Sequence, residues 1–176
     1  ADGQVVTTTL PSLTASVSEV PPGAGLAAPT LTLDQALVAP EVLAGQLVFT
    51  PAAALAPGAH TLALTWPDLA GNQTLVRRTF WVDPATQVRI TSPAAGAVFN
   101  APETNAIVEG EPGAAVTVTV GAAVFTGRLD AAGWLTFREI ALQPGSNSLT
   151  AHAVDAAGNT AEHTLSVAMD AGQDAA

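Results

Sequence analysis

The side chains best suited to chemistry are oxygen donors that occur in two matching sets. Calcium is bound by roughly six to eight oxygen atoms, several of them from carboxylates, so Asp and Asn residues of this kind are candidate ligands. Each set, however, has only one Asp and one Asn within a single loop, without the run of alternating acidic residues that is typical of a calcium-binding loop. A plain hairpin turn is the favoured interpretation, and calcium is the alternative left open. The candidates are Asp68, Asn72 and Asp83 in the first set, and Asp155, Asn159 and Asp170 in the second.

The two sets belong to an internal repeat. Residues 55–83 match residues 142–170 without a gap, at an offset of 87 residues. The match keeps a Pro-Gly pair, an Asp-x-Ala-Gly-Asn segment and a final Asp, so one structural unit occurs twice. In the segment, the Asp accepts backbone N–H groups and starts a turn, and the Gly supplies the positive φ that closes a hairpin.

Other side chains could take part in catalysis. Glu109 and Glu111 offer the carboxylate pair that glycoside hydrolysis uses, but no aromatic residues line them, so a solvated turn is favoured. His163 matches the inward-facing Val76 of the first repeat and is interpreted as a partly buried structural residue. With no cysteine and no carboxylate cluster near the histidines, we expect no catalytic site and no cofactor other than calcium. The three histidines are His60, His152 and His163.

Tryptophan side chains are the candidates for binding a partner. Trp81 and Trp134 could stack on a sugar ring or on another protein, because each ring buries a large area. The favoured interpretation is that Trp81 packs at the joint between the domains and Trp134 in a core. Of Arg77 and Arg78, we expect one to point outward and the other to point inward or to lie at an edge.

Composition excludes several classes of protein. The net charge is −10, with five arginines and no lysine, which argues against binding nucleic acid or an anionic membrane. Cysteine is absent, so there is no disulfide, thiol catalysis or thiolate metal site. No run of about 18 apolar residues predicts a membrane span, and no secretion signal begins the sequence.

The elements that position these residues are short strands. No segment has the spacing of an amphipathic helix, and turn signals separate strands about 8–12 residues apart, which predicts an all-β protein of two sandwiches. A turn at 21–25, one helical turn at 52–55 and a tight turn at 131–133 are also expected. The predicted strands are 13–17, 31–33, 42–51, 60–66 and 73–82 in the first domain, and 88–91, 106–110, 116–120, 123–129, 134–140, 148–154 and 160–169 in the second.

The repeat also predicts the domain boundaries: 1–83, a linker at 84–87, 88–170, and a tail at 171–176. Residues 1–6 are similar to residues 94–99, which in the second domain follow the opening strand near 88–91. We therefore expect the first domain to lack its opening strand and the chain to begin inside a domain. The linker contains one proline, which predicts a semi-rigid joint.

With these residues in view, the chain resembles bacterial Ig-like domains of surface and secreted proteins. The first domain resembles modules of RHS/YD-repeat proteins and adhesins, and the second is similar to modules appended to secreted glycoside hydrolases. The resemblance implies two tandem Ig-like antiparallel β-sandwiches of about seven strands each. The segments that carry it are 49–62, 68–72 and 82–83, then 90–93, 110–118, 142–147 and 155–159.

The resemblance implies a non-enzymatic spacer or stalk of an exported bacterial surface protein, extracellular or on the cell surface. Its partners would be neighbouring domains or other copies of itself. One alternative is a subunit of an extracellular filament, assembled by donating a β-strand into the incomplete first domain. Another is a carbohydrate-binding accessory domain, against which the few aromatic residues count.

Overall fold

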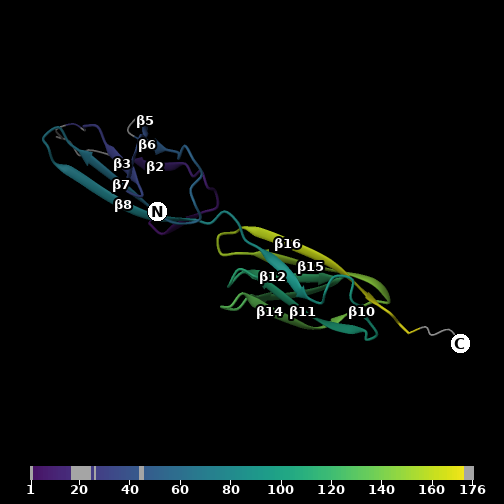
Figure 1. The fold of residues 1–176 in the computed structure, drawn as a ribbon. Helices are drawn as coiled ribbons and strands as arrows, with labels where there is room; N and C mark the ends of the chain where they lie inside the picture. The colour runs from purple at the N-terminus through teal and green to yellow at the C-terminus, as the bar shows by residue number, and fades with distance from the viewer. Residues whose placement is uncertain (1, 17–24, 26, 44–45, 173–176) are drawn as a thin grey trace. The chain divides into compact units, whose positions relative to one another are not determined.

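A computed structural model describes residues 2–16, 25, 27–43 and 46–172, and the chain divides into two units, Ala1–Pro84 and Ala85–Ala176 (Figure 1). Each unit is described by itself. The predictions made for Val17, for the turn at 21–24 and for the tail at 173–176 lie outside the described residues. Among the described residues, no helix has the length and apolar character needed to cross a bilayer.

Unit 1 is a sandwich of two sheets around one apolar core. The five-stranded sheet has the order β1 (Gln4–Val6), β8 (Gln73–Val82), β7 (Gly58–Pro67), β3 (Thr30–Leu33) and β4 (Ala36–Val38). The three-stranded sheet has the order β2 (Leu13–Ser16), β6 (Gln46–Phe49) and β5 (Glu41–Leu43). Residues that alternate along these strands supply the core: Leu31, Leu33, Leu47, Phe49, Leu64, Trp66, Phe80 and Val82.

Unit 2 also consists of one five-stranded and one three-stranded sheet. The five-stranded sheet has the order β10 (Val98–Phe99), β16 (Thr160–Met169), β15 (Gly145–Val154), β12 (Ala115–Val120) and β13 (Ala123–Arg128). The second sheet has the order β14 (Trp134–Ala141), β11 (Glu103–Gly110) and β9 (Val88–Ser92). The strand order of both units confirms the prediction of tandem Ig-like β-sandwiches.

Strands β1 and β10 confirm the match between residues 1–6 and 94–99. β1 pairs in parallel with the last strand of unit 1, with Val6 opposite Val82. β10 pairs in parallel with the last strand of unit 2, with Phe99 opposite Met169. β9, which comes before β10, has no counterpart among the described residues of unit 1. That the first domain lacks its opening strand stays a prediction.

Three local predictions were wrong. In place of the single strand predicted at 42–51 there are two antiparallel strands, β5 and β6, in which Val42 lies opposite Leu47. Residues 52–55 form no helical turn, because the five residues between Pro51 and Pro57 are too few to sustain one, and the Leu55 N–H donates to the Thr9 carbonyl (2.8 Å). β4 was missed because its two-residue turn, Asp34-Gln35, contains no glycine although both residues have positive φ.

Candidate functional site

The repeated Asp-x-Ala-Gly-Asn segments are hairpin turns in both units. The Asp68 N–H donates to the Asn72 carbonyl (2.8 Å). In return the Asn72 backbone N–H donates to Oδ1 of Asp68 (2.8 Å) and the Asn72 amide donates to Oδ2 (2.7 Å). Asp155 and Asn159 make the same three contacts, at 3.1, 2.8 and 2.8 Å. Both oxygens of each carboxylate are thus acceptors within their own turn.

The tight turn predicted at 131–133 is present, and sequence reasoning missed that it is a third copy of the repeated turn. Asp130 accepts from the backbone N–H groups of Ala132 (2.8 Å) and Trp134 (2.9 Å), and its own N–H donates to the Trp134 carbonyl (3.0 Å). The signal was present, since residues 130–133 and 155–158 both read Asp-Ala-Ala-Gly. The turn forms here with Trp in place of Asn. Turn formation is therefore a sufficient explanation for the shared Asp.

The turn hydrogen bonds also set the charge of the two repeated Asp residues. The Asn72 amide and the loop N–H groups hold the pKa of Asp68 below its ordinary value, against a smaller opposing effect of desolvation. Burial by itself would raise the pKa of Asp155, but the hydrogen bonds from Asn159 and the loop backbone outweigh it and lower that pKa. Both groups are acceptors as carboxylates at neutral pH.

The remaining candidate calcium ligands, Asp83 and Asp170, lie away from these turns. In unit 1 the turn follows Pro67, which is opposite Gln73, whereas Asp83 follows Val82 at the other end of the hairpin. Ten residues of strand separate the two ends by roughly 30 Å. The hairpin of unit 2 has the same arrangement. Neither unit brings its predicted Asp, Asn and Asp together, and calcium binding at the turns stays a prediction.

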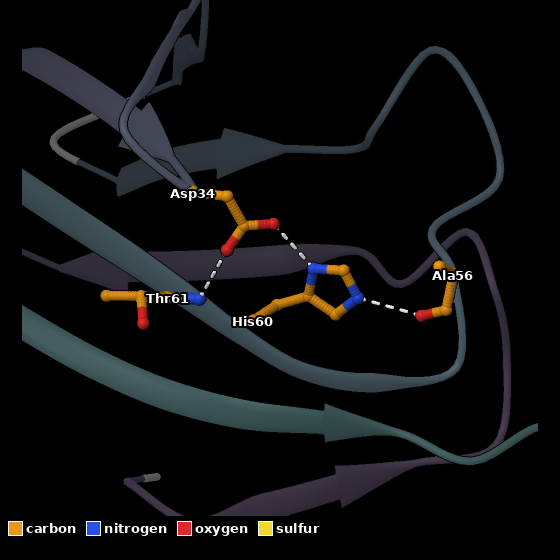
Figure 2. Close-up of polar contacts among 4 residues, drawn as sticks. All are labelled: Asp34, Ala56, His60 and Thr61. Carbon is orange, nitrogen blue, oxygen red and sulfur yellow. Dashed lines mark hydrogen bonds and ion pairs between the residues drawn. The ribbon is translucent and has the colours of Figure 1, made fainter.

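A histidine-centred cluster ties together the other end of the unit 1 hairpin (Figure 2). Nδ1 of His60 lies 2.6 Å from Oδ2 of Asp34, and Nε2 lies 2.8 Å from the Ala56 carbonyl. The other oxygen of Asp34 accepts the Thr61 N–H (2.8 Å). The ring of His60 also stacks on Phe80, with 5.6 Å between centroids. The cluster links the β3–β4 turn, the loop before β7, and the core.

The contacts of the cluster favour a charged pair. The Ala56 carbonyl and the Asp34 carboxylate raise the pKa of His60, although burial opposes them. Burial would raise the pKa of Asp34, but hydrogen bonds from the Thr61 N–H and from His60 lower it. The imidazolium form supplies donors to both partners, which a neutral ring cannot do. Sequence reasoning listed His60 and missed Asp34, because only the strand pairing brings them together.

Unit 2 has Asn147 at the position that matches His60. Its side chain is buried and its amide donates to the carbonyls of Gln143 (2.7 Å) and Gly145 (3.1 Å). Its Oδ1 accepts the Gln143 N–H (2.8 Å). Gln143 matches Ala56, so the two side chains hold the same loop by the same carbonyl. The role of this position in both units is structural.

The other histidines and the two glutamates are distributed along unit 2. The Ile90 N–H lies 3.3 Å from Nδ1 of His163, which is half-buried and links β9 to β16. His152 is exposed and lies opposite Glu162 on the neighbouring strand β16, which also carries His163. Glu109 is exposed on β11, and Glu111 lies in the turn after it. The partly buried, structural interpretation of His163 is confirmed.

The predictions for the tryptophans and arginines were partly correct. Trp134 is 41% exposed and lies opposite Glu109 at the edge strand β14, so its predicted place in the core was wrong. The alternation of β14 buries Phe137 and leaves Trp134 outside. Trp81 is 44% exposed, and its packing at a domain joint stays a prediction. Arg77 points outward and Arg78 inward, since Arg78 lies opposite the core-packed Leu62.

Comparisons with known proteins give likeness in structure only. No model of a protein family matches the chain, and no curated protein does. The D00-D0 domain of intimin is 12% identical, over 95% of this chain and 96% of that one, with a TM-score of 0.48. Fibronectin(III)-like modules of Clostridium thermocellum CbhA are 14% identical, over 96% and 90%, with a TM-score of 0.47. A bacterial ice-binding adhesin is 18% identical, over 95% and 61%, with a TM-score of 0.44. Values of this size assign no family and no activity.

Proposed function

We propose that this chain is a non-enzymatic, force-bearing spacer module of an exported bacterial surface protein. The observation that supports it is the parallel pairing of an early strand with the last strand in each unit. In unit 1 the N–H of Gly3 donates to Thr79 (2.7 Å) and that of Asp83 to Val6 (2.9 Å). The Thr79 N–H also donates to the Asp2 carboxylate (2.7 Å).

The parallel pairing of β1 with β8 determines how unit 1 responds to tension. Tension on such a chain pulls the start of β1 and the end of β8 apart along the strand direction. Every hydrogen bond between the strands is then loaded at once, whereas an antiparallel pair pulled from one end opens bond by bond. Unit 2 has matching bonds from Gly96 to Ser166 (2.7 Å) and from Asp170 to Phe99 (2.8 Å). A module built in this way suits a chain under load.

The polar side chains that could have formed a catalytic site support the same proposal. Asp68, Asp130 and Asp155 hydrogen-bond within turns, while His60 and Asn147 hold loops. The resemblance of the sequence to Ig-like domains of surface and secreted proteins supports export to a bacterial surface. Neighbouring domains of the same protein are the partners that a spacer requires.

Single-molecule pulling tests the mechanical part of this proposal. The chain has no cysteine, so handles can be attached through cysteines added at its two ends. Val6→Pro removes a backbone N–H from β1 and should lower the force at which unit 1 unfolds. The matched control is a core variant on β3, Leu33→Ala, chosen for a comparable loss of unfolding free energy. Equal falls in force for the two variants would reject the proposal.

A second candidate, glycan binding, is favoured by the exposed ring of Trp134 beside Glu109. An exposed indole with polar neighbours can stack on a sugar ring. Trp134 fluorescence is measured across a glycan panel in a Trp66→Phe, Trp81→Phe background. No change with any glycan would eliminate this candidate, and a change that Trp134→Ala abolishes would favour it.

A further inference from the structure

Strand β9 closes one side of the unit 2 sandwich. It pairs antiparallel with β11, so that Ile90 lies opposite Val108 and Ser92 opposite Ile107. Val88 and Ile90 belong to the buried core, at 8% and 3% exposure. In unit 2 this edge is thus occupied by an extended strand with inward aliphatic side chains at alternate positions.

Strand β2 is the counterpart of β11. Leu13 lies opposite Phe49 and Ala15 opposite Leu47, as Ala106 lies opposite Phe137 and Val108 opposite Leu135 in unit 2. Among the described residues, β2 pairs with β6 on one edge and with no strand on the other. By this correspondence, a strand placed like β9 would lie against the open edge at Thr14 and Ala15.

A groove is present beside that edge. It has a volume of about 270 Å³ and lies between β2, β1, β7 and β8. Its apolar walls come from Val6, Leu13, Leu62 and Phe80. The same correspondence places the groove next to the position that Ser92 occupies in unit 2, because Thr14 corresponds to Ile107, which lies opposite Ser92.

One groove residue differs in chemistry from its unit 2 counterpart. Arg78 corresponds to Leu165, which is buried in the core of unit 2. Each lies opposite a leucine that faces the core, Leu62 or Leu149. Arg78 is on the inward row of β8, lines the groove and is exposed. A guanidinium in this position pairs best with a carboxylate on whatever fills the groove.

We propose that the groove beside β2 receives an extended polypeptide strand, antiparallel to β2, with inward aliphatic side chains and a carboxylate that meets Arg78. Main-chain hydrogen bonds to the open edge of β2 give affinity, and the inward side chains give selectivity. The proposal rests on the groove and on the comparison with β9, so it is independent of the mechanical function.

Synthetic peptides test this proposal on the full chain. The reference peptide has the sequence of residues 86–93, which contains β9, and a second peptide carries Ser92→Glu to face Arg78. A third peptide carries Val88→Asp and Ile90→Asp and should not bind. We expect the Ser92→Glu peptide to bind about five-fold more tightly than the reference peptide, by titration calorimetry.

The chain variant Arg78→Leu is the matched control. It installs the residue that unit 2 has at this position, so it should keep the fold and reverse the preference between the first two peptides. Hydrogen exchange should show that bound peptide protects residues 13–16. Failure of the Ser92→Glu peptide to bind at millimolar concentration would overturn the proposal. Protection elsewhere, or an unchanged preference in Arg78→Leu, would overturn it as well.

Discussion

His60 in unit 1 and Asn147 in unit 2 occupy matching positions and bind the carbonyl four residues earlier, of Ala56 and Gln143. Asn147 satisfies its amide within its own loop. His60 extends farther and also contacts Asp34 on the β3–β4 turn. The comparison teaches that the repeat preserves a loop-holding contact, while the side chain that makes it can change. Only unit 1 makes this contact depend on pH.

The two units also differ in their cores. In unit 2, β9 packs against β16, and Leu165 on β16 is buried. In unit 1 the matching row contains Arg78 beside a groove. A polar residue at an inward position is costly in a closed core and is tolerated where water or a partner reaches it. The arginine at position 78 is therefore tolerated because this side of unit 1 is open.

The largest expected effect is a difference in lost unfolding free energy between matching leucine substitutions in the closed core of unit 2 and the open core of unit 1. Leu149→Ala should lower the unfolding free energy of unit 2 by about 3 kcal/mol, because Leu149 is fully buried and its removal leaves a cavity. The matching variant, Leu62→Ala, should cost unit 1 about 1 kcal/mol, because Leu62 lines the groove. Urea unfolding followed by hydrogen exchange assigns each loss to its unit. Equal costs would contradict the description of unit 1 as open.

The next effect tests whether the three turns are equivalent. A methyl group at Gly133 would lie 2.5 Å from the Gly110 carbonyl oxygen, at a φ of +82°. Gly71 and Gly158 have φ of +93° and +89° with open space around them. Gly133→Ala should therefore cost about 3 kcal/mol, and Gly71→Ala and Gly158→Ala about 1 kcal/mol each. Unequal costs for the last two in urea unfolding would break the equivalence of the repeated turns.

A smaller effect is the pH dependence of unit 1. The folded-state pKa of His60 is raised from 6.5, so its contribution is complete below pH 6.5 and is lost as the pH rises through the folded-state pKa. The pKa of Asp34 is lowered from 3.8, so its contribution is present above pH 3.8 and is lost as the pH falls. Asp34 is 46% exposed, and solvent screening limits the pair to less than about 1 kcal/mol.

Unfolding of the chain at pH 6 and pH 8 measures this dependence for each unit. The control is His60→Asn, which introduces the unit 2 residue and should remove the loss of unit 1 stability between these pH values. If His60→Asn retains the full dependence, the charged pair with Asp34 is not its source.

The smallest expected effect concerns calcium. Both oxygens of Asp68 and of Asp155 already accept hydrogen bonds within their turns. We expect no measurable rise in Tm with calcium up to about 1 mM, the range in which extracellular calcium modules bind. A rise that disappears in both Asn72→Ala and Asn159→Ala would instead favour metal sites at the turns.

Most strands could be predicted because their pattern is local. The alternation of Leu62, Leu64 and Trp66 identified β7, and the repeat transferred that identification to β15. The turn at Asp34-Gln35 escaped because neither residue is a glycine. Trp134 was misplaced because its position on the outer face depends on which residues of β14 meet β11. Burial of one tryptophan is decided by strand register, which short-range pattern does not specify.

The sequence by itself determined the two-fold repeat, the all-β class and the roles of the Asp-x-Ala-Gly turns, because these depend on residues within one hairpin. Only the tertiary structure joined Asp34 to His60, which are 26 residues apart and meet through the pairing of β3 with β7. It also placed Arg78 beside a groove where unit 2 has a buried leucine. Contacts between distant strands depend on register and on which edges are covered, and neither property is encoded in a local pattern.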